Sequence, residues 1–191
     1  MEKETISAIF LGIGLAASCG FRVFVPMLIA AIAARTGFLP VSESFEWLSS
    51  GTAIACFGVA TLVEIIAYYV PFIDNLLDTI SSPLAIGAGT LLAASVIPMD
   101  SELFKWVLAL IVGGGAASVV QGATTVSRLG SSTVTAGLGN PVIASGENLA
   151  AIGLPVLTIT WPLIFGTLIV LFMLYLLRRV FRKNGKIKSV E

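Results

Sequence analysis

The sequence predicts an all-α membrane protein with about six transmembrane helices, arranged as a 3+3 inverted repeat in which some helices are broken. The chain has 191 residues, of which 57% are hydrophobic and 12% are charged, and its mean hydropathy is +0.99. Soluble domains are much more polar than this. In addition, short sequence words recur in the same order in the two halves of the chain, and each half contains about three apolar runs.

The predicted spans are apolar runs that approach or reach the ~20 residues needed to cross the hydrocarbon core of a bilayer. They are 6–34, 50–70, 83–98, 104–121, 147–160 and 161–177. The first is long enough to be tilted or broken, and the fifth is short. Five spans therefore remain an alternative to six. A short interfacial helix is expected at 71–82, and we treat 1–191 as a single membrane domain.

The predicted repeat is based on three short sequence motifs that occur in both halves of the chain. Gly14, Ala16, Ala17 and Ser18 recur as Gly114, Ala116, Ala117 and Ser118, Glu64 recurs as Glu147, and Pro83-Leu84 with Gly87 recurs as Pro162-Leu163 with Gly166. The first copy would occupy about 8–98 and the second about 104–180. With three spans in each copy, the two would cross the membrane in opposite senses. Inverted repeats are an architecture of secondary transporters, whose binding site lies where the copies meet.

The charges predict an orientation. Six of the Lys and Arg residues fall in the tail at 178–191, directly after the last apolar run. Positive charge beside a span usually stays in the cytoplasm, so six spans would place both termini there. A nucleic-acid-binding or lipid-binding arm is the alternative reading of this tail, but a topology anchor is its usual meaning. We expect the bilayer as a partner and no nucleic acid.

The composition also excludes several kinds of chemistry. There is no histidine, which removes Ser-His triads and His-ligated zinc or haem. Asp74 and Asp78 form a single acidic pair, whereas Mg²⁺-diphosphate chemistry in a membrane enzyme needs more acidic ligands. We therefore expect no cofactor, no metal and no enzymatic activity, and an intramembrane enzyme is a remote alternative.

Arg22 is the main candidate for solute binding, because it lies in the middle of the first apolar run. A charge at that depth costs at least ~2.5–3.5 kcal/mol and should face the interior of the bundle. Ser18 lies on the same helix face. The repeat equivalents are Ser118 and Gly122, and the glycine would leave space for a solute beside Arg22. The alternatives are that Arg22 neutralises Glu64, or that it marks a break in the helix.

Glu64 and Glu147 are the candidates for binding a coupling ion. Carboxylates within a membrane can bind and release protons or coordinate Na⁺, and the repeat would place one on each side of the site. The alternative for Glu64 is a salt bridge with Arg22. The alternative for Glu147 is that it lies in the first turn of a helix capped by Ser145, where a negative charge is favourable.

The segment 122–146 is unusual, because it holds five Gly and eight Ser or Thr residues and has Arg128 as its only charge. It predicts either irregular backbone that lines a polar cavity or a flexible cytoplasmic loop. Gly139-Asn140-Pro141 indicates a break in the chain, and Asn140 is a further candidate for solute contact. The spacing of Gly114, Ser118 and Gly122 is typical of close helix packing, either within the protein or in a homo-oligomer.

The run from Gly14 to Pro26, followed by Glu64 and Pro71-x-x-Asp74, resembles a family of small bacterial integral membrane proteins known as a domain of unknown function (DUF4126). The resemblance covers roughly residues 8–175 and implies the plasma membrane of a bacterium, but no activity. From the residues we expect a secondary transporter or facilitator for a small polar or anionic solute, with proton or sodium coupling as an open question. The alternative is a non-transporting scaffold or accessory subunit.

Overall fold

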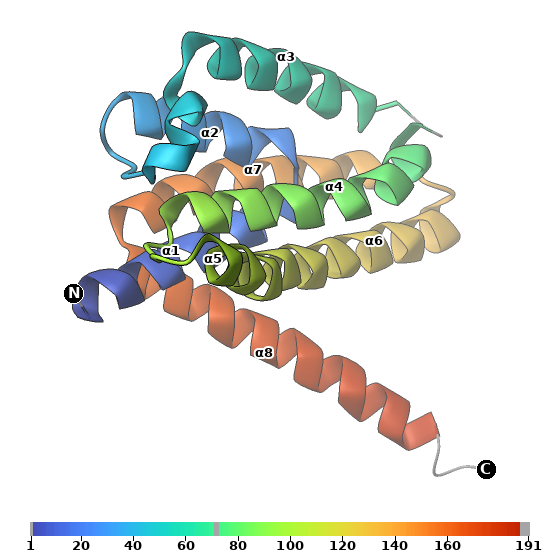
Figure 1. Cartoon of the computed structure of the whole chain (residues 1–191). Coiled ribbons are helices and arrows are strands. Elements are labelled where there is room, and N and C mark those ends of the chain that lie inside the picture. The colour runs from blue at the N-terminus through green and yellow to red at the C-terminus, as the bar shows by residue number, and fades with distance from the viewer. Residues whose placement is uncertain (1, 71–72, 188–191) are drawn as a thin grey trace.

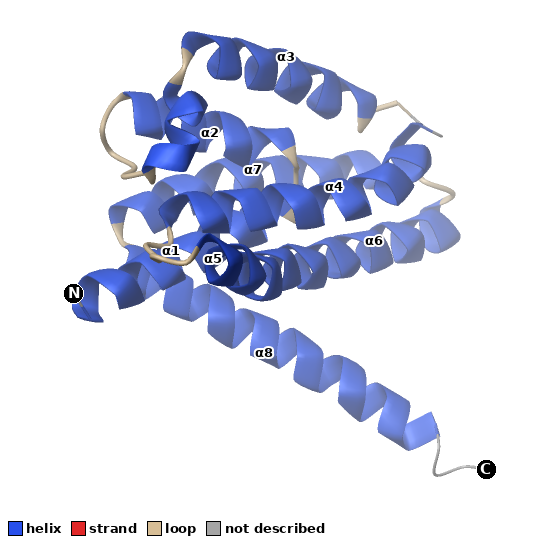
Figure 2. Cartoon of the chain, in the orientation of Figure 1, coloured by secondary structure: helices blue, strands red, loops and turns tan. Residues whose placement is uncertain are grey.

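The computed structural model describes residues 2–70 and 73–187, with the side chains of 2, 74, 75, 78 and 179–187 left out of the description. Within these residues every regular element is helical (Figure 2). The elements are α1 (Glu2–Cys19), α2 (Phe24–Arg35), η1 (Glu43–Ser49), α3 (Gly51–Ala67), α4 (Ile73–Val96), α5 (Glu102–Ala109), η2 (Leu110–Gly114), α6 (Gly115–Thr135), α7 (Asn140–Thr160) and α8 (Pro162–Ile187).

The elements form a bundle whose two ends differ (Figure 1). We name the η1 end after the short helix that lies there; α1 begins, α2 and α4 end, and α8 begins at this end. The turns after α3 and α6 lie at the opposite end. α3, α4, α6 and α7 run along the length of the bundle, whereas α8 diverges from it.

The first apolar run forms a helical hairpin and not one long span. α1 enters from the η1 end, stops at Cys19, and α2 returns toward the same end (Figure 1). Pro26 explains the break, because in a continuous helix its ring would clash with the carbonyl of Arg22. Gly20 allows the turn to press on α6, since a Cβ there would lie 2.6 Å from the carbonyl oxygen of Ala117.

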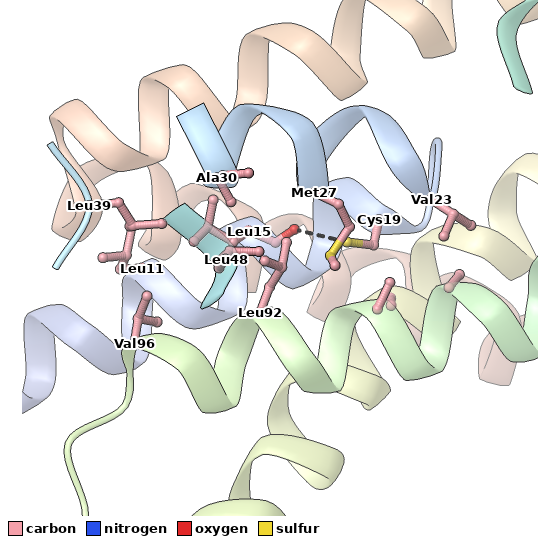
Figure 3. Close-up of a cluster of buried hydrophobic side chains, with 14 residues drawn as sticks. Leu11, Leu15, Cys19, Val23, Met27, Ala30, Leu39, Leu48, Leu92 and Val96 are labelled. Atoms are coloured by element: carbon pink, nitrogen blue, oxygen red, sulfur yellow. Dashed lines mark hydrogen bonds between the residues drawn. The ribbon is translucent and has the colours of Figure 1, made fainter. Parts of the chain in front are cut away.

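The hairpin forms the core of the protein together with α4. Leu11, Leu15 and Cys19 of α1 pack against Leu92 and Val96 of α4 (Figure 3), and the Cys19 thiol donates a hydrogen bond to the carbonyl of Leu15. Both α2 and the segment around Leu39 and Leu48 cover the other side of α1 (Figure 3). The α1 arm of the hairpin is thus buried, whereas α2 keeps an exposed face at Ile32.

Small residues set the contact of α4 with α1 and α6. A Cβ at Gly89 would lie 2.8 Å from the Cβ of Ala117 and 3.4 Å from that of Ala16, and one at Gly113 would lie 2.5 Å from the Cβ of Ala93. Such positions admit no larger side chain without movement of the backbone. Small residues in this chain therefore serve contacts between its own helices.

The same contacts fix the relative direction of α1 and α6. Along α4, residues 93 and 89 meet Gly12 and Ala16 of α1, and they meet Gly113 and Ala117 in the same order. α1 and α6 therefore both run antiparallel to α4 and parallel to each other. An inverted repeat requires the segments around Gly14 and Gly114 to run in opposite senses, so the predicted inverted repeat is not confirmed. α3 and α7 do run in opposite senses, as do α4 and α8 (Figure 1).

Three helical segments are long and apolar enough to cross a membrane, namely Thr79–Val96, Glu102–Thr135 and Asn140–Thr160. A fourth span results if η1 and α3, which meet at an angle of 61°, count as one bent segment. The six predicted spans are therefore confirmed only as an all-helical fold with three or four candidate spans among the described residues.

The segments expected to be irregular are mostly helical. α6 continues to Thr135 and α7 begins at Asn140, so the polar stretch 122–146 breaks only at 136–139, where Ala136 and Gly137 have φ of 52° and 87°. The predicted break beside Asn140 is thus present, but the rest of the stretch is helical and forms neither the extended irregular backbone nor the flexible loop expected from the sequence. Residues 73–82 belong to α4 and do not form a separate interfacial helix.

Candidate functional site

The break between α1 and α2 places Arg22 inside the bundle, where its side chain meets α7. Arg22 is only 1% exposed. Its guanidinium forms an ion pair with Glu147, with Nη1 2.9 Å from Oε2. Nε donates a hydrogen bond of 2.7 Å to Oδ1 of Asn148, and Nη1 and Nη2 donate to the carbonyls of Phe21 and Ala144.

Glu147 also pairs with a second buried arginine, Arg128 of α6. Nε of Arg128 donates to Oε1 of Glu147 at 3.1 Å, and Nη2 forms an ion pair with Oε2. Arg128 is 2% and Glu147 4% exposed. One carboxylate thus bridges two guanidinium groups, an arrangement in which each charge-assisted hydrogen bond is stronger than a neutral one.

The ring of Tyr68 lies against both arginines. The guanidinium carbons of Arg22 and Arg128 are 3.8 Å and 4.2 Å from the centre of this ring. The phenol oxygen is 2.9 Å from the hydroxyl of Ser81 in α4. Cation–π contacts of this kind are worth about 2 kcal/mol or more where water is excluded, so Tyr68 helps to hold the two positive groups in place.

Glu64 caps the N-terminus of α2. Its carboxylate accepts hydrogen bonds from the backbone N–H groups of Val23 and Phe24, at 2.7 Å and 3.0 Å. These are unsatisfied donors at the start of a helix, and a negative charge is favourable there. Because α3 supplies Glu64, the cap also ties the tip of the hairpin to α3.

Arg22 and Glu64 are close enough for their charges to interact, as expected from the sequence, but the predicted salt bridge between them is not among the contacts of the described residues. Among the described residues, Arg22 forms its ion pair with Glu147, and Glu64 binds the backbone beside Arg22. The alternative reading of Arg22 as the mark of a helix break is confirmed. The helix-start reading of Glu147 does not hold, because it lies in the second turn of α7 and faces the interior.

We refer to Arg22, Glu64, Arg128 and Glu147 as the charged cluster. Each member is less than 7% exposed, and the four formal charges of this cluster sum to zero. Of the predicted site residues, Arg22, Glu64 and Glu147 are brought together. Asn140 is buried on the same face of α7, and its side-chain nitrogen donates to the hydroxyl of Ser132.

The other predicted contacts of Arg22 are directed elsewhere. Ser18 is buried and donates to the carbonyl of Gly14 in its own helix, and Ser118 donates to the carbonyl of Gly114. Ser118 and Gly122 are exposed, so Gly122 leaves no space beside Arg22. Four residues advance 400° around an α-helix, so each such step rotates the position by ~40° from the starting face. Gly122 is two steps from Gly114 and therefore does not share the face with which Gly114 contacts α4.

Sequence reasoning missed Arg128, Tyr68 and Asn148 as members of the site. Arg128 did have a signal, because it is the only charge in a long stretch of small and hydroxylated residues. Its role became visible only once that stretch proved to be helical. The predicted acidic pair, Asp74 and Asp78, lies outside the described side chains. Within the described part of the chain, no group of three or more His, Cys, Asp or Glu residues could hold a metal ion.

A hollow of about 350 Å³ lies beside the charged cluster. Glu147 forms part of its wall, together with Thr124 and Ser127 of α6 and Phe172 of α8. The cluster is therefore next to a space, although the side chains themselves are buried.

The chain belongs to the family described as Domain of unknown function (DUF4126), whose model matches residues 9–183. No curated protein and no solved structure shows a significant match to it. Membership confirms the resemblance seen in the sequence, and the description of the family carries no activity.

Proposed function

We propose that this family member is a secondary transporter or facilitator for a small polar or anionic solute in the plasma membrane of a bacterium. The observation that carries the proposal is the meeting of a broken helix with four buried charges. Ionisable groups inside a membrane are costly and commonly mark the path of a solute or ion. A helix that ends within the bundle is tolerable where it is buried in protein or lines a cavity.

We further propose a topology of five crossings and one re-entrant hairpin. α1 and α2 would enter and leave from one side, and α3, α4, α5–α6, α7 and α8 would each cross. The basic residues that begin at Arg178 follow the last crossing and favour a cytoplasmic C-terminus. The η1 end carries the acidic residues Glu43, Glu46, Asp100 and Glu102 and suits the outer face.

This topology changes one expectation from the sequence, namely that both termini are cytoplasmic. An odd number of crossings places the N-terminus outside. Figure 1 supports the change, because the N-terminus lies at the η1 end and α8 extends toward the opposite end. Among the described residues, three or four helices meet the length and composition expected of a span, so the crossings of α3 and α8 are part of the proposal.

The charged cluster suggests how an anionic solute would be held. A carboxylate or phosphate could take the place of Glu147 on Arg22 and Arg128, whose forked donors suit planar anions. It could also take the place of Glu64 at the N-terminus of α2, since the ends of broken helices bind anionic groups in transporters. In both cases the solute replaces an internal carboxylate, so the positive groups are never left without a partner.

The same exchange offers a role for the two glutamates in coupling. When Glu147 binds a proton or Na⁺, its attraction for Arg22 and Arg128 falls, and the arginines become available to a solute anion. Glu64 would act in the same way on the N-terminus of α2. Ion binding and solute binding would then favour the same state of the protein, as coupling requires.

A scaffold or accessory subunit is the second candidate, and the close packing of α1, α4 and α6 favours it. In that case the charged cluster is a structural tie between the hairpin, α3, α6 and α7. The small residues at Gly89, Gly113 and Ala117 are used within the chain, so a homo-oligomer would need another surface. Nothing in the described residues favours an enzyme, and we do not propose one.

Electrogenic transport by the purified protein in liposomes tests the proposal. Acetate, succinate, phosphate and sulfate are applied in turn to proteoliposomes on a solid-supported membrane, and protein-free liposomes set the background. We expect a current for at least one anion, reduced about tenfold in Arg22→Lys, which corresponds to ~1.4 kcal/mol. The control is Arg35→Lys, at an exposed position of the η1 end, and should equal the unmodified protein. Equal currents in Arg22→Lys and Arg35→Lys would contradict a role for Arg22.

A further inference from the structure

α3 lies on the outside of the bundle and packs mainly against α2 (Figure 1). Its outward face is exposed, since Val59, Leu62 and Ile66 are each more than 60% exposed. Its inward face presents Glu64 and, four residues later, Tyr68, which a helix places on the same side. Both residues are buried, so α3 meets the charged cluster with the last turn of one face.

The start of α3 has the geometry of a hinge. The preceding helix, η1, is fixed in the core by Phe45 and Leu48, which are 3% and 0% exposed. η1 and α3 meet at an angle of 61°, and Ser50 between them has extended backbone, with ψ of 149°. Hinges are commonly a few residues at the ends of helices or in loops. α3 would therefore pivot at Ser50 while η1 stays in place.

The opposite end of α3 is held by side-chain hydrogen bonds. The hydroxyl of Tyr69 lies 2.9 Å from that of Ser145 in α7, and it accepts a hydrogen bond of 3.4 Å from Nδ2 of Asn148. Asn148 itself accepts a hydrogen bond from Nε of Arg22. Tyr69 is 42% exposed, so a short polar path leads from the surface of the protein, between α3 and α7, to the guanidinium of Arg22.

Glu64, Tyr68 and Tyr69 together form what we call the α3 latch. Tyr68 covers the guanidinium groups of Arg22 and Arg128, and Glu64 occupies the N-terminus of α2. These are the two places at which we propose that a solute anion binds. Because α3 carries both covering side chains, one movement of this helix would uncover both places.

A small rotation of α3 is sufficient to open the latch. α3 has 17 residues and is therefore about 25 Å long. A rotation of ~10° at Ser50 moves the far end of a helix of this length by about 4 Å, which breaks hydrogen bonds that require a separation of ~3 Å. When α3 takes Glu64 away, the three remaining charges of the cluster sum to +1, which favours the entry of an anion.

We propose that α3 is the cytoplasmic gate of the charged cluster, which pivots at Ser50 and is held closed against α4 and α7 by the α3 latch. The latch end of α3 is the end that our topology places toward the cytoplasm. Glu64 and a solute anion compete for the same N–H groups of α2, so an anion binds the open state and shifts α3 toward it. The inference rests on the proposed function, because it names the element that controls access to that same site.

Cysteine labelling measures the opening of α3 without any need for transport. In a Cys56→Ser background, a single cysteine is added at Ala144, whose carbonyl binds Arg22 behind the latch, or at Ala85 in the apolar core. Both positions are 0% exposed. A membrane-impermeant methanethiosulfonate reagent is applied to inside-out vesicles, and the rate of labelling is measured.

The test variant is Tyr69→Phe, which removes the hydroxyl of the latch and keeps the ring. The matched control is Tyr175→Phe in α8, where the side chain is 58% exposed. We expect Tyr69→Phe to accelerate labelling at Ala144→Cys by about fivefold, since the net contribution of one hydrogen bond corresponds to a factor of this size. Tyr175→Phe should leave the rate unchanged, and Ala85→Cys should stay unlabelled in every background. An unchanged rate in Tyr69→Phe, or equal acceleration at Ala85→Cys, would overturn the gate.

A second measurement locks the latch. In Tyr69→Cys/Ser145→Cys, a short bifunctional methanethiosulfonate joins α3 to α7, and a reductant releases it. The gate predicts that the crosslinked protein carries no anion current in proteoliposomes and that the reductant restores the current. A current that survives complete crosslinking would overturn the gate and leave transport intact. Faster labelling in Tyr69→Phe, with no anion current in the unmodified protein, would contradict transport and keep α3 as a flap over the charged cluster.

Discussion

Replacing Glu147 by Gln should destabilise the protein strongly, because this carboxylate is shared by two buried arginines. At an effective dielectric constant of 20, two unit charges 4 Å apart attract by about 4 kcal/mol. Glu147 pairs with both Arg22 and Arg128, so the gross loss is about 8 kcal/mol. Part of this is offset, because Gln keeps one hydrogen-bond acceptor for the arginines. Breaking a buried ion pair usually costs about 3–5 kcal/mol, and we expect a value in that range.

The free energy of unfolding in mixed micelles measures this loss. The control is Glu102→Gln, which removes the partner of Lys105. The side chain of Glu102 is 60% exposed and that of Lys105 only 3%, so water screens this pair on one side and its loss should cost less than the loss of Glu147, which is buried together with both of its partners. In addition, the double variant Glu147→Gln/Arg22→Met should be more stable than Glu147→Gln alone, because it leaves one buried arginine without this carboxylate instead of two. If Glu147→Gln costs no more than Glu102→Gln, the charged cluster does not tie the hairpin to α6 and α7.

Two further predictions follow from the arrangement of the helices. Reporter fusions should place the N-terminus outside the cell and the C-terminus in the cytoplasm, and two cytoplasmic termini would contradict the re-entrant hairpin. Gly113→Ala should lower the free energy of unfolding by about 1–3 kcal/mol, because its Cβ would lie 2.5 Å from both the Cβ of Ala93 and the carbonyl oxygen of Gly89. Gly115→Ala, whose Cβ meets nothing within 4 Å, should be neutral or stabilising by up to about 1 kcal/mol, and equal effects would refute the packing argument.

The all-helical fold and three members of the charged cluster could be predicted from the sequence. A charge is conspicuous in an apolar run, which identified Arg22 and Glu64, and the repeated words identified Glu147. The partners could not be predicted in the same way. They depend on where the first run breaks, and the break gives Glu64 a backbone to cap and turns Arg22 toward α7.

The segment 122–146 shows a second limit of sequence reasoning. Gly, Ser and Thr are weak helix formers, so the stretch suggested loop or irregular structure. In the protein these residues are largely helical, which brings Arg128 onto Glu147. The repeated motifs suggested an inverted repeat that the fold does not confirm. Gly14 and Gly114 both allow close helix packing, but their helices run in the same direction.

The central claim is that the charged cluster belongs to a site that water and solutes can reach, and cysteine accessibility tests it most directly. Cys56 is replaced by Ser, because it is exposed, and Cys19 is kept, because it is buried. A single cysteine is then placed at Ala144, whose carbonyl binds Arg22, or at Ala85 in the apolar core; both positions are 0% exposed. A membrane-impermeant methanethiosulfonate reagent is applied to inside-out vesicles. We predict that Ala144→Cys is labelled and Ala85→Cys is not. If neither is labelled from either side of the membrane, the cluster is a dry structural tie and the transporter proposal is contradicted.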